Sequence, residues 1–368
     1  MEKDLYRLGI IEALEGMKAG QFSCADYCRV LLKRIAVRDS EVQAWAWLDY
    51  ERAMALAEAR DNERRGGSAL PLHGLPVAVK DIIRTRGIPT GMGSPIFDGN
   101  VPQESARVVE KLEAAGAWVM GKSVTTEFAY MRPGKTRNPW NPAHTPGGSS
   151  MGSAAAVAAG FVPAAIGTQT NGSVIRPAAF CGVAGFKPSF DLISFSGANV
   201  FSPTLDHMGI FARSVADAAR FAAFLTEKPG AIAPDIALPN QEPRLVAVRS
   251  PVWHLASPAQ QARFASDVAA LKKTGARVTE IDLPQTFGAG HRALRAIMLF
   301  EAARQLEPVQ QAHRSRMSDC LNRSLDEGRA IPETDYRAAL DTRTGLKAEL
   351  EKFLKGFDAI ITPPAPGE

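Results

Sequence analysis

The apolar and polar positions along the chain predict blocks of helices followed by alternating helices and strands. In residues 1–70 apolar residues recur at helical spacing in three stretches: one up to about residue 18, one that begins at the capping residue Ser23, and one over 49–65. A Gly- and Pro-containing segment then interrupts this spacing. We therefore predict a helical N-terminal part.

Strands and helices alternate in the next part. The apolar run LPVAV predicts a strand that ends on Lys80, and an amphipathic helix within 104–115 precedes an apolar strand at 117–120. A helix followed by a strand in this order is typical of an α/β sheet. The Pro-rich segment 131–147 is predicted to be an irregular loop.

The part after residue 188 begins with a loop that carries Asp206 and His207. Periodicity then predicts helix 214–225, a Pro-rich connector 228–243, strand 245–248, helix 258–274, strand 277–282, long helices 289–305, 308–326 and 334–355, and a final strand from about 358. This order again indicates an α/β protein.

Composition limits the class of protein. The chain has 368 residues, 45% of them hydrophobic, and its 43 Lys and Arg exceed its 39 Asp and Glu by a net charge of +4. So small a surplus does not favour binding to nucleic acid or to an anionic membrane, and the N-terminus has no long apolar run. The four cysteines show no CxxC pair or metal-ligand clustering. We therefore expect a cytoplasmic protein without a structural disulfide, a metal or a cofactor.

Residues 147–188 are rich in glycine, serine and alanine, which lets the main chain approach a ligand closely. Ser149 and Ser173 flank a predicted helix at 153–159 and a predicted strand at 162–168, and this hairpin can bring the two hydroxyls together. A serine hydroxyl is a poor nucleophile at neutral pH and needs a base within hydrogen-bond reach.

Lys80 is the predicted base. Among the six histidines only His207 lies beside an acidic residue, Asp206, and no triad arrangement is recognisable. A lysine at the end of a buried strand loses hydration, which lowers its pKa and makes the neutral amine available. With an ordinary pKa near 10.4, only about 0.04% of the amine would be neutral at pH 7. This function therefore requires burial.

Two further segments match known sequence motifs, but the secondary structure predicted around them does not fit those motifs. Residues 116–123 (GAWVMGKS) fit the phosphate-binding pattern GxxxxGK[ST], but their middle is an apolar strand, whereas a phosphate loop follows a strand and opens a helix. Residues 148–152 (GSSMG) fit the GxSxG pattern with Ser150 as the nucleophile, but a Pro-rich loop leads into them where a strand is needed.

Three ordered segments resemble the amidase signature family: PLHGLPVAVKD, PGGSSMGSAAAVAAG and GTQTNGSVIRPAAFCGVAGFKPS. The resemblance extends to about residue 220 and more loosely to the end. It implies an α/β fold with a central mixed sheet flanked by helices on both faces, and amide hydrolysis by a Ser-Ser-Lys triad. By this resemblance Ser173 is the nucleophile, Ser149 bridges it to Lys80, and a cis peptide bond after Gly148 holds Ser149.

The segment before the predicted nucleophile also predicts an oxyanion hole. We expect the backbone N–H groups of Thr170, Asn171, Gly172 and Ser173 to converge on the developing negative charge, where each donor lowers the barrier by roughly 3 to 4 kcal/mol. The alternative is a serine that only caps the following helix.

Arg176 lies about one helical turn after Ser173 and can reach the same pocket. Its guanidinium suits a substrate carboxylate, and the GSVIRP version of the motif is most similar to malonamidase-type members; a structural arginine that pins the loop is the alternative. Three positions depart from the common pattern, because Met151 and Asn171 replace glycines and Gln169 replaces an aspartate. We expect Met151 to narrow the pocket and Asn171 to tolerate a left-handed backbone.

We predict a single domain over 1–368, with a helical part at 1–70, a catalytic core at 71–225 and a helix and strand part at 226–368. By the resemblance, family members continue past the final TPPAP element with further strands. The chain is therefore expected to lack C-terminal strands and to leave a sheet edge uncovered.

The favoured function is hydrolysis of the C–N bond of a small carboxamide through an acyl-enzyme. We expect a small-molecule substrate and no nucleic acid or membrane partner, and a homodimer is compatible with this function. The amidase subunit of a transfer-RNA amidotransferase, which has the same triad and a partner, is one alternative. A non-catalytic remnant of the fold is the other. Three polar residues near the motifs, Asp81, Glu127 and His207, are expected to orient the backbone or to be solvated.

Overall fold

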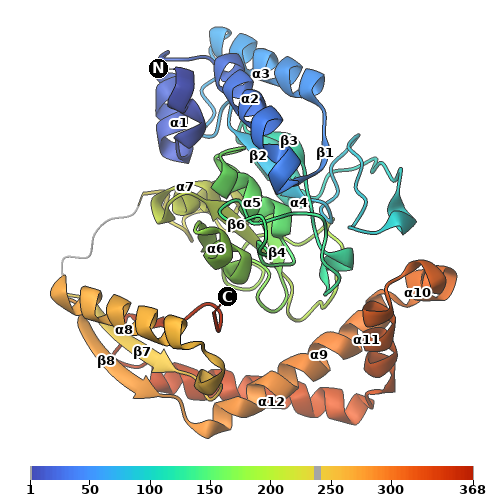
Figure 1. The fold of residues 1–368 in the computed structure, drawn as a ribbon, viewed down its shortest axis with the longest axis vertical. Coiled ribbons are helices and arrows are strands. Elements are labelled where there is room, and N and C mark those ends of the chain that lie inside the picture. The colour runs from blue at the N-terminus through green and yellow to red at the C-terminus, as the bar shows by residue number, and fades with distance from the viewer. Residues whose placement is uncertain (1, 236–241, 368) are drawn as a thin grey trace. The chain divides into compact units, whose positions relative to one another are not determined.

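The computed structural model describes residues 2–235 and 242–367, so part of the Pro-rich connector at 228–243 lies outside the described residues. Contacts divide the chain into two compact units (Figure 1). These units are residues 1–236 with 305–323, and residues 237–304 with 324–368. The division does not test whether the two units form a single domain, so the single-domain organisation stays a prediction.

The first unit is built on a six-stranded sheet with the strand order β1-β3-β2-β4-β6-β5. Strand β2 is parallel to β3 and β4, whereas the pairs β1–β3, β4–β6 and β5–β6 are antiparallel. The strands are β1 (Trp45–Leu48), β2 (Pro76–Lys80), β3 (Trp118–Ser123), β4 (Ala164–Gln169), β5 (Ala184–Phe186) and β6 (His207–Ala212). The mixed sheet agrees with the fold class that the sequence predicts.

Three of these strands are missed by the sequence pattern. β1 and β5 have only 4 and 3 residues, too few to show a period of two. β6 is buried at all but its first position, so it shows a continuous apolar run without alternation. The prediction that His207 lies in a loop is therefore wrong, since it is the first residue of β6.

The described residues of the first unit also form eight complete α-helices. They are α1 (Ile10–Lys18), α2 (Cys24–Val42), α3 (Tyr50–Arg65), α4 (Arg107–Ala114), α5 (Met151–Ala159), α6 (Ile175–Cys181), α7 (Val215–Leu225) and α10 (Glu307–His313). Short 3-10 helices lie at Glu2–Arg7, Pro95–Phe97, Glu127–Ala129 and Arg314–Arg316. The predicted helix start at Ser23 is confirmed, because its hydroxyl accepts a hydrogen bond from Asp26 N at 3.0 Å.

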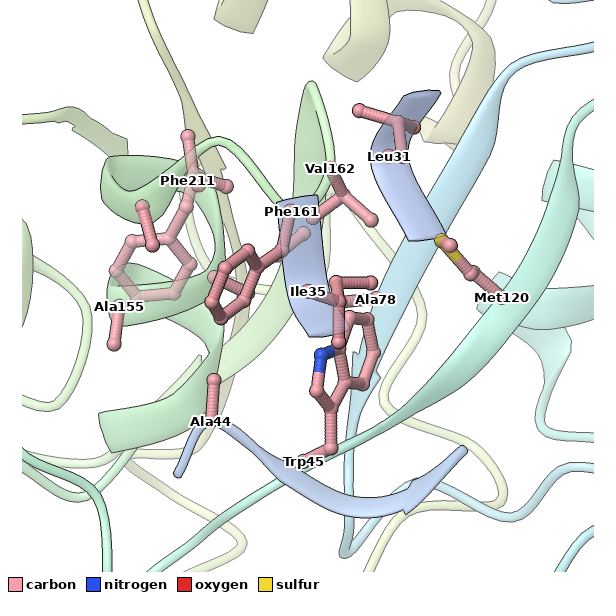
Figure 2. Packing of buried hydrophobic residues seen from close by; sticks show 14 of the residues in the cluster. Leu31, Ile35, Ala44, Trp45, Ala78, Met120, Ala155, Phe161, Val162 and Phe211 are labelled. Atoms are coloured by element: carbon pink, nitrogen blue, oxygen red, sulfur yellow. The ribbon is translucent and has the colours of Figure 1, made fainter. Parts of the chain in front are cut away.

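Alternate residues of the central strands pack into two hydrophobic clusters, one on each face of the sheet. Ala78 belongs to the first cluster, with residues of α2 and α5, whereas Val77 and Val79 belong to the second, with residues of α4 and α7. Figure 2 shows part of the first cluster, in which the rings of Trp45 and Phe161 lie near Ala78. Helices therefore cover both faces of the sheet, as the sequence predicts.

The second unit has a three-stranded parallel sheet in the order β8-β7-β9. Its elements are β7 (Arg244–Arg249), α8 (Pro258–Lys273), β8 (Arg277–Asp282), α9 (Ala289–Gln305), α12 (Glu333–Phe353), β9 (Ala359–Ile361) and most of the residues of α11 (Asp319–Ala330), with 3-10 helices at Trp253–Leu255 and Gln285–Gly288. The expected lack of further C-terminal strands stays a prediction.

The prediction of one long helix over 308–326 is wrong. Helix α10 ends at His313, and α11 begins only at Asp319. Between them Met317 has an extended backbone, and the N–H of Ser318 bonds to a carboxylate far away in the sequence. This tertiary contact replaces the next helical hydrogen bonds.

Candidate active site

Lys80 occupies the last position of β2 and is fully buried. Because side chains alternate along a strand, Lys80 projects to the same face as Ala78, which is the face covered by α5. Its Nζ atom donates hydrogen bonds to Ser149 Oγ and to Thr168 Oγ1, both at 2.8 Å. The structure thus places the amine among hydroxyl groups from the loop before α5 and from β4.

The pKa of Lys80 is lowered to about 7, chiefly because burial disfavours the charged ammonium. The negative charge of Asp206 opposes this shift, and the positive charge of Arg176 adds to it. With this pKa, about half of the amine is unprotonated at pH 7. The burial that a lysine base requires is therefore present.

The loop before α5 brings Ser149 to the amine. Gly147 has a left-handed backbone with φ of +75°, and a Cβ at this position would lie 2.9 Å from Pro177 Cα. Only glycine fits these two conditions. The Gly148–Ser149 peptide bond is cis, as the family resemblance implies.

The structure agrees with the rejection of the GxSxG match at 148–152 and of the phosphate-loop match at 116–123. Ser150 is fully buried, and its hydroxyl donates to Thr168 O at 3.1 Å and accepts from Thr168 N at 3.2 Å. It joins the start of α5 to β4 and is not the exposed serine of a GxSxG turn. Residues Trp118–Ser123 form β3 and open no helix, so they do not make a phosphate loop.

Ser173 lies in a short loop between β4 and α6 and is 7% exposed. The side chain of Gln169 closes this loop, because its Oε1 accepts from Val174 N at 2.9 Å and from Ile175 N at 3.0 Å. Among the described residues, the N–H groups of residues 171–173 donate to no protein acceptor. Without a protein acceptor, these amides can donate to water or to a ligand.

The structure therefore brings together part of the predicted triad. Lys80 and Ser149 are hydrogen-bonded, whereas Ser149 and Ser173 share no hydrogen bond in the part of the chain described. Catalytic hydrogen bonds are often long without substrate and tighten in its complex. The catalytic roles of the three residues stay predictions.

Arg176 is tied to the loop that carries Ser149. Its Nε and Nη2 atoms both donate to Gly148 O, at 3.1 and 2.8 Å. A Cβ on Gly172 would lie 3.5 Å from Arg176 Nη1, so this third nitrogen faces the Ser173 loop. The contacts give the arginine a structural role and leave Nη1 for the predicted one.

Two departures from the family pattern are accommodated without strain. Met151 is 2% exposed, and its sulfur accepts from Gly134 N at 3.2 Å, so it fills space beside the Pro-rich loop. Asn171 does not have a positive φ, so its expected tolerance of a left-handed backbone is not needed. Its side chain is exposed, and this position has no conformational need for glycine.

Sequence reasoning missed three residues of this region. Thr168 is the second partner of Lys80, and Asp206 accepts a hydrogen bond from Thr170 Oγ1 at 2.5 Å. Lys122, in β3, is a second fully buried lysine. The signal that identified Lys80, a lysine at the end of an apolar strand, was also present at Lys122, but the other two depend on strand pairing that local patterns do not show.

Asp81, Glu127 and His207 were expected to orient the backbone or to be solvated. Each of them forms a hydrogen bond with a backbone group. Asp81 accepts from Gly91 N at 3.1 and 3.2 Å. Glu127 accepts from the N–H of Ser318 at 3.1 Å and from its hydroxyl. The Nδ1 atom of His207 lies 2.6 Å from Leu205 O.

Comparisons with known proteins assign the family. Residues 26–368 match the family model described as Amidase. A glutamyl-tRNA(Gln) amidotransferase subunit from Anaeromyxobacter sp. (strain K) is 46% identical over 224 residues, which are 59% of this chain and 46% of that protein. The corresponding protein from Chloroflexus aggregans (strain MD-66 / DSM 9485) is 31% identical, covering 99% of this chain and 83% of the relative. A crystal structure of an amidase has a TM-score of 0.87 and 33% identity over 96% of this chain and 81% of that chain.

The chain belongs to the amidase family, the amidase signature enzymes that the sequence resembles. Family and structural likeness support an amide-hydrolysing enzyme. The chain spans about half the length of several curated relatives that it matches. Across the described residues, no helix is long and apolar enough to cross a membrane.

The expected partners need correction. The prediction of a small-molecule substrate without nucleic acid is wrong, because the curated relatives are named subunits of an amidotransferase that acts on glutamyl-tRNA(Gln). The net charge of +4 did not indicate such relatives, because net charge bears on association and solubility and does not identify a family.

Proposed function

We propose that this chain cleaves a carboxamide through an acyl-enzyme on Ser173, as the amidase subunit of a transfer-RNA amidotransferase. The observation that carries the chemistry is the buried 2.8 Å hydrogen bond between Lys80 Nζ and Ser149 Oγ. The amides of residues 171–173, which have no acceptor among the described residues, support an oxyanion hole beside it. Thr170 N is included in this site, as the sequence predicts.

Neutral Lys80 is the proposed base. Its lone pair accepts the proton of Ser149, while one of its own N–H groups donates to Thr168. Ser149 takes the proton of Ser173 in the same step, and the Ser173 oxygen bonds to the amide carbon. The backbone amides of residues 171–173 then donate to the negatively charged oxygen.

The acyl-enzyme forms when the C–N bond breaks. The proton held by Lys80 returns through Ser149 to the leaving nitrogen, which departs as ammonia or an amine. Water then attacks the ester carbon and gives a proton to the same relay. The C–O bond to Ser173 breaks, the relay returns the proton to the Ser173 oxygen, and the carboxylic acid leaves. In an amidotransferase the released nitrogen is delivered to an acceptor.

Arg176 is proposed to bind a carboxylate of the amide donor. Two of its nitrogens already hold Gly148, so the contact would use Nη1, which faces the Ser173 loop. The guanidinium remains charged at any pH at which the enzyme works, although burial lowers its pKa. This role would distinguish donors that carry a carboxylate from neutral ones.

The names of the curated relatives favour an amidotransferase over an amidase that acts alone. Those names give glutamyl-tRNA(Gln) as the acceptor, and they describe the proteins as subunits, which indicates partners. We propose the same reaction class for this chain, with a partner subunit, in the cytoplasm.

The test is to purify the tagged chain from its own cells and to identify the proteins bound to it. We expect a partner subunit, formation of an amide on glutamyl-tRNA(Gln) by the wild type, and none by Ser173→Ala, which should still bind the partner. Activity retained by Ser173→Ala would contradict the acyl-enzyme. Full amide hydrolysis without a partner, and without any tRNA product, would contradict the amidotransferase part alone.

A further inference from the structure

Asp206 lies where the loop that carries Ser173 leaves the sheet, and it is only 7% exposed. Its Oδ1 atom accepts a hydrogen bond from Thr170 Oγ1 at 2.5 Å. Its Oδ2 atom accepts from the N–H groups of Phe201 and Ser202, at 2.7 and 3.0 Å. One carboxylate thus joins the segment after β4 to the segment before β6.

The strand ladder ends next to this contact. β4 and β6 pair as far as Gln169 and His207, and Thr170 and Asp206 are the next residues beyond that pair. At the other end of the loop, the Gln169 side chain accepts the N–H groups at the start of α6. Residues 171–173 are therefore held from both ends, and their amides remain without a protein acceptor in the described structure.

We infer that Asp206 is a positioning residue, which fixes the start of the Ser173 loop so that the amides of residues 171–173 keep one arrangement. The inference rests on the proposed function, because these amides are the proposed oxyanion donors. Without the carboxylate, the Thr170 hydroxyl and two backbone N–H groups lose a shared acceptor. A displacement of about 1 Å in such a site costs about 100-fold in rate.

Asp206 also acts on the charge of Lys80. Two charged groups shift the pKa of Lys80: Asp206 raises it and Arg176 lowers it. Removal of the Asp206 charge therefore lowers the pKa of Lys80, and the neutral amine persists to lower pH. The acid limb of the pH–rate profile then moves to lower pH, which a purely structural role would not produce.

The experiment compares three variants of the whole chain: Asp206→Asn, Thr170→Val and Asp191→Asn. Asparagine has the shape of aspartate, but its NH₂ group cannot accept a hydrogen bond. It must therefore face a group that donated to the carboxylate, and that hydrogen bond is lost. Thr170→Val removes the hydrogen bond and leaves the charge. Asp191 is exposed and lines the same cavity of about 380 Å³ as Asp206, so its substitution is the charge control.

The measured quantity is the rate at which an alkyl fluorophosphonate labels Ser173, over about pH 5 to 9, with thermal unfolding recorded for each variant. We expect Asp206→Asn to react about 100-fold more slowly, with its acid limb at lower pH. Thr170→Val should be slowed about 10-fold, with the acid limb unmoved. Asp191→Asn should match the wild type in both respects.

A wild-type rate and acid limb in Asp206→Asn would overturn the inference. If that variant does not fold, a wild-type labelling rate in Thr170→Val overturns it in the same way. These failures differ from failure of the proposed function, in which the wild-type chain itself is not labelled at Ser173.

Discussion

Two fully buried lysines on adjacent parallel strands have different neighbours and therefore different chemistry. Lys80 ends β2, and Lys122 lies one residue before the end of β3. The acceptors around Lys80 are the hydroxyls of Ser149 and Thr168. In the described part of the chain no carboxylate lies within ion-pair distance of it.

Lys122 has an anion beside it. Its Nζ atom donates to Ile83 O at 2.5 Å and to Thr90 Oγ1 at 2.8 Å, and it lies 3.9 Å from Asp81 Oδ1. Burial lowers the pKa of Lys122, but Asp81 opposes the shift. Burial therefore lowers the pKa of both lysines, to about 7 for Lys80 and to about 8 for Lys122, which has a carboxylate at 3.9 Å.

The largest expected effect comes from Lys80→Met. It should lower the rate of amide cleavage by at least about 10⁴-fold, because the relay loses its base. The fold should persist, since an apolar side chain replaces a buried amine. The rate of ammonia release and the melting temperature measure the two effects. A rate near that of the wild type would remove Lys80 from the mechanism.

The matched variant, Lys122→Met, should act on stability first. It leaves the buried carboxylate of Asp81 without its cation, and the free energy of unfolding should fall by about 3 to 5 kcal/mol. Urea unfolding measures this loss. The double variant with Asp81→Asn should recover most of it, because the stranded charge is then gone. A single variant as stable as the wild type would show that the ion pair does not stabilise the fold.

The pH dependence should follow Lys80 and not Lys122. Below pH 7 the pKa of Lys80, about 7, leaves the amine protonated and unable to accept a proton. The value of kcat/KM should therefore rise about tenfold per pH unit up to about pH 7 and then level off. Lys122→Met, assayed where it is folded, should keep the same limb. If the acid limb moved in Lys122→Met, the titrating group would be Lys122 and not Lys80.

Arg176→Ala should change the rate least of these variants. It extends the comparison of the two lysines, because Arg176 lowers the pKa of Lys80 whereas Asp81 raises that of Lys122. Without Arg176 the pKa of Lys80 rises, so the acid limb should move to higher pH. The KM of a carboxylate-bearing donor should rise roughly tenfold, and that of a neutral donor less. Equal increases for both donors would leave only the contact with Gly148 as its role.

Local sequence patterns predicted most helices and the outline of the site. Helix starts at Ser23 and Ser214 are confirmed, because each hydroxyl accepts a hydrogen bond from the third residue of its helix. The burial of Lys80 and the cis bond at Ser149 also agree with the sequence and its family resemblance. These features depend on residues close together in the chain or on ordered motifs.

The missed features depend on contacts between distant segments. Asp206 meets Thr170 only because β4 and β6 pair, and β6 itself showed no alternation. The break between α10 and α11 depends on the bond from Ser318 to Glu127, which no local pattern contains. The same holds for the ion pair of Lys122.

The bond between Ser318 and Glu127 joins residues 191 positions apart. A ribosome that makes about 5 to 20 residues per second therefore needs roughly 10 to 40 seconds to produce the donor after its acceptor has emerged. During that time the Glu127 carboxylate, which is 2% exposed in the finished molecule, must be satisfied by water. This contact of the first unit is thus completed only by a late part of the nascent chain, within residues 305–323.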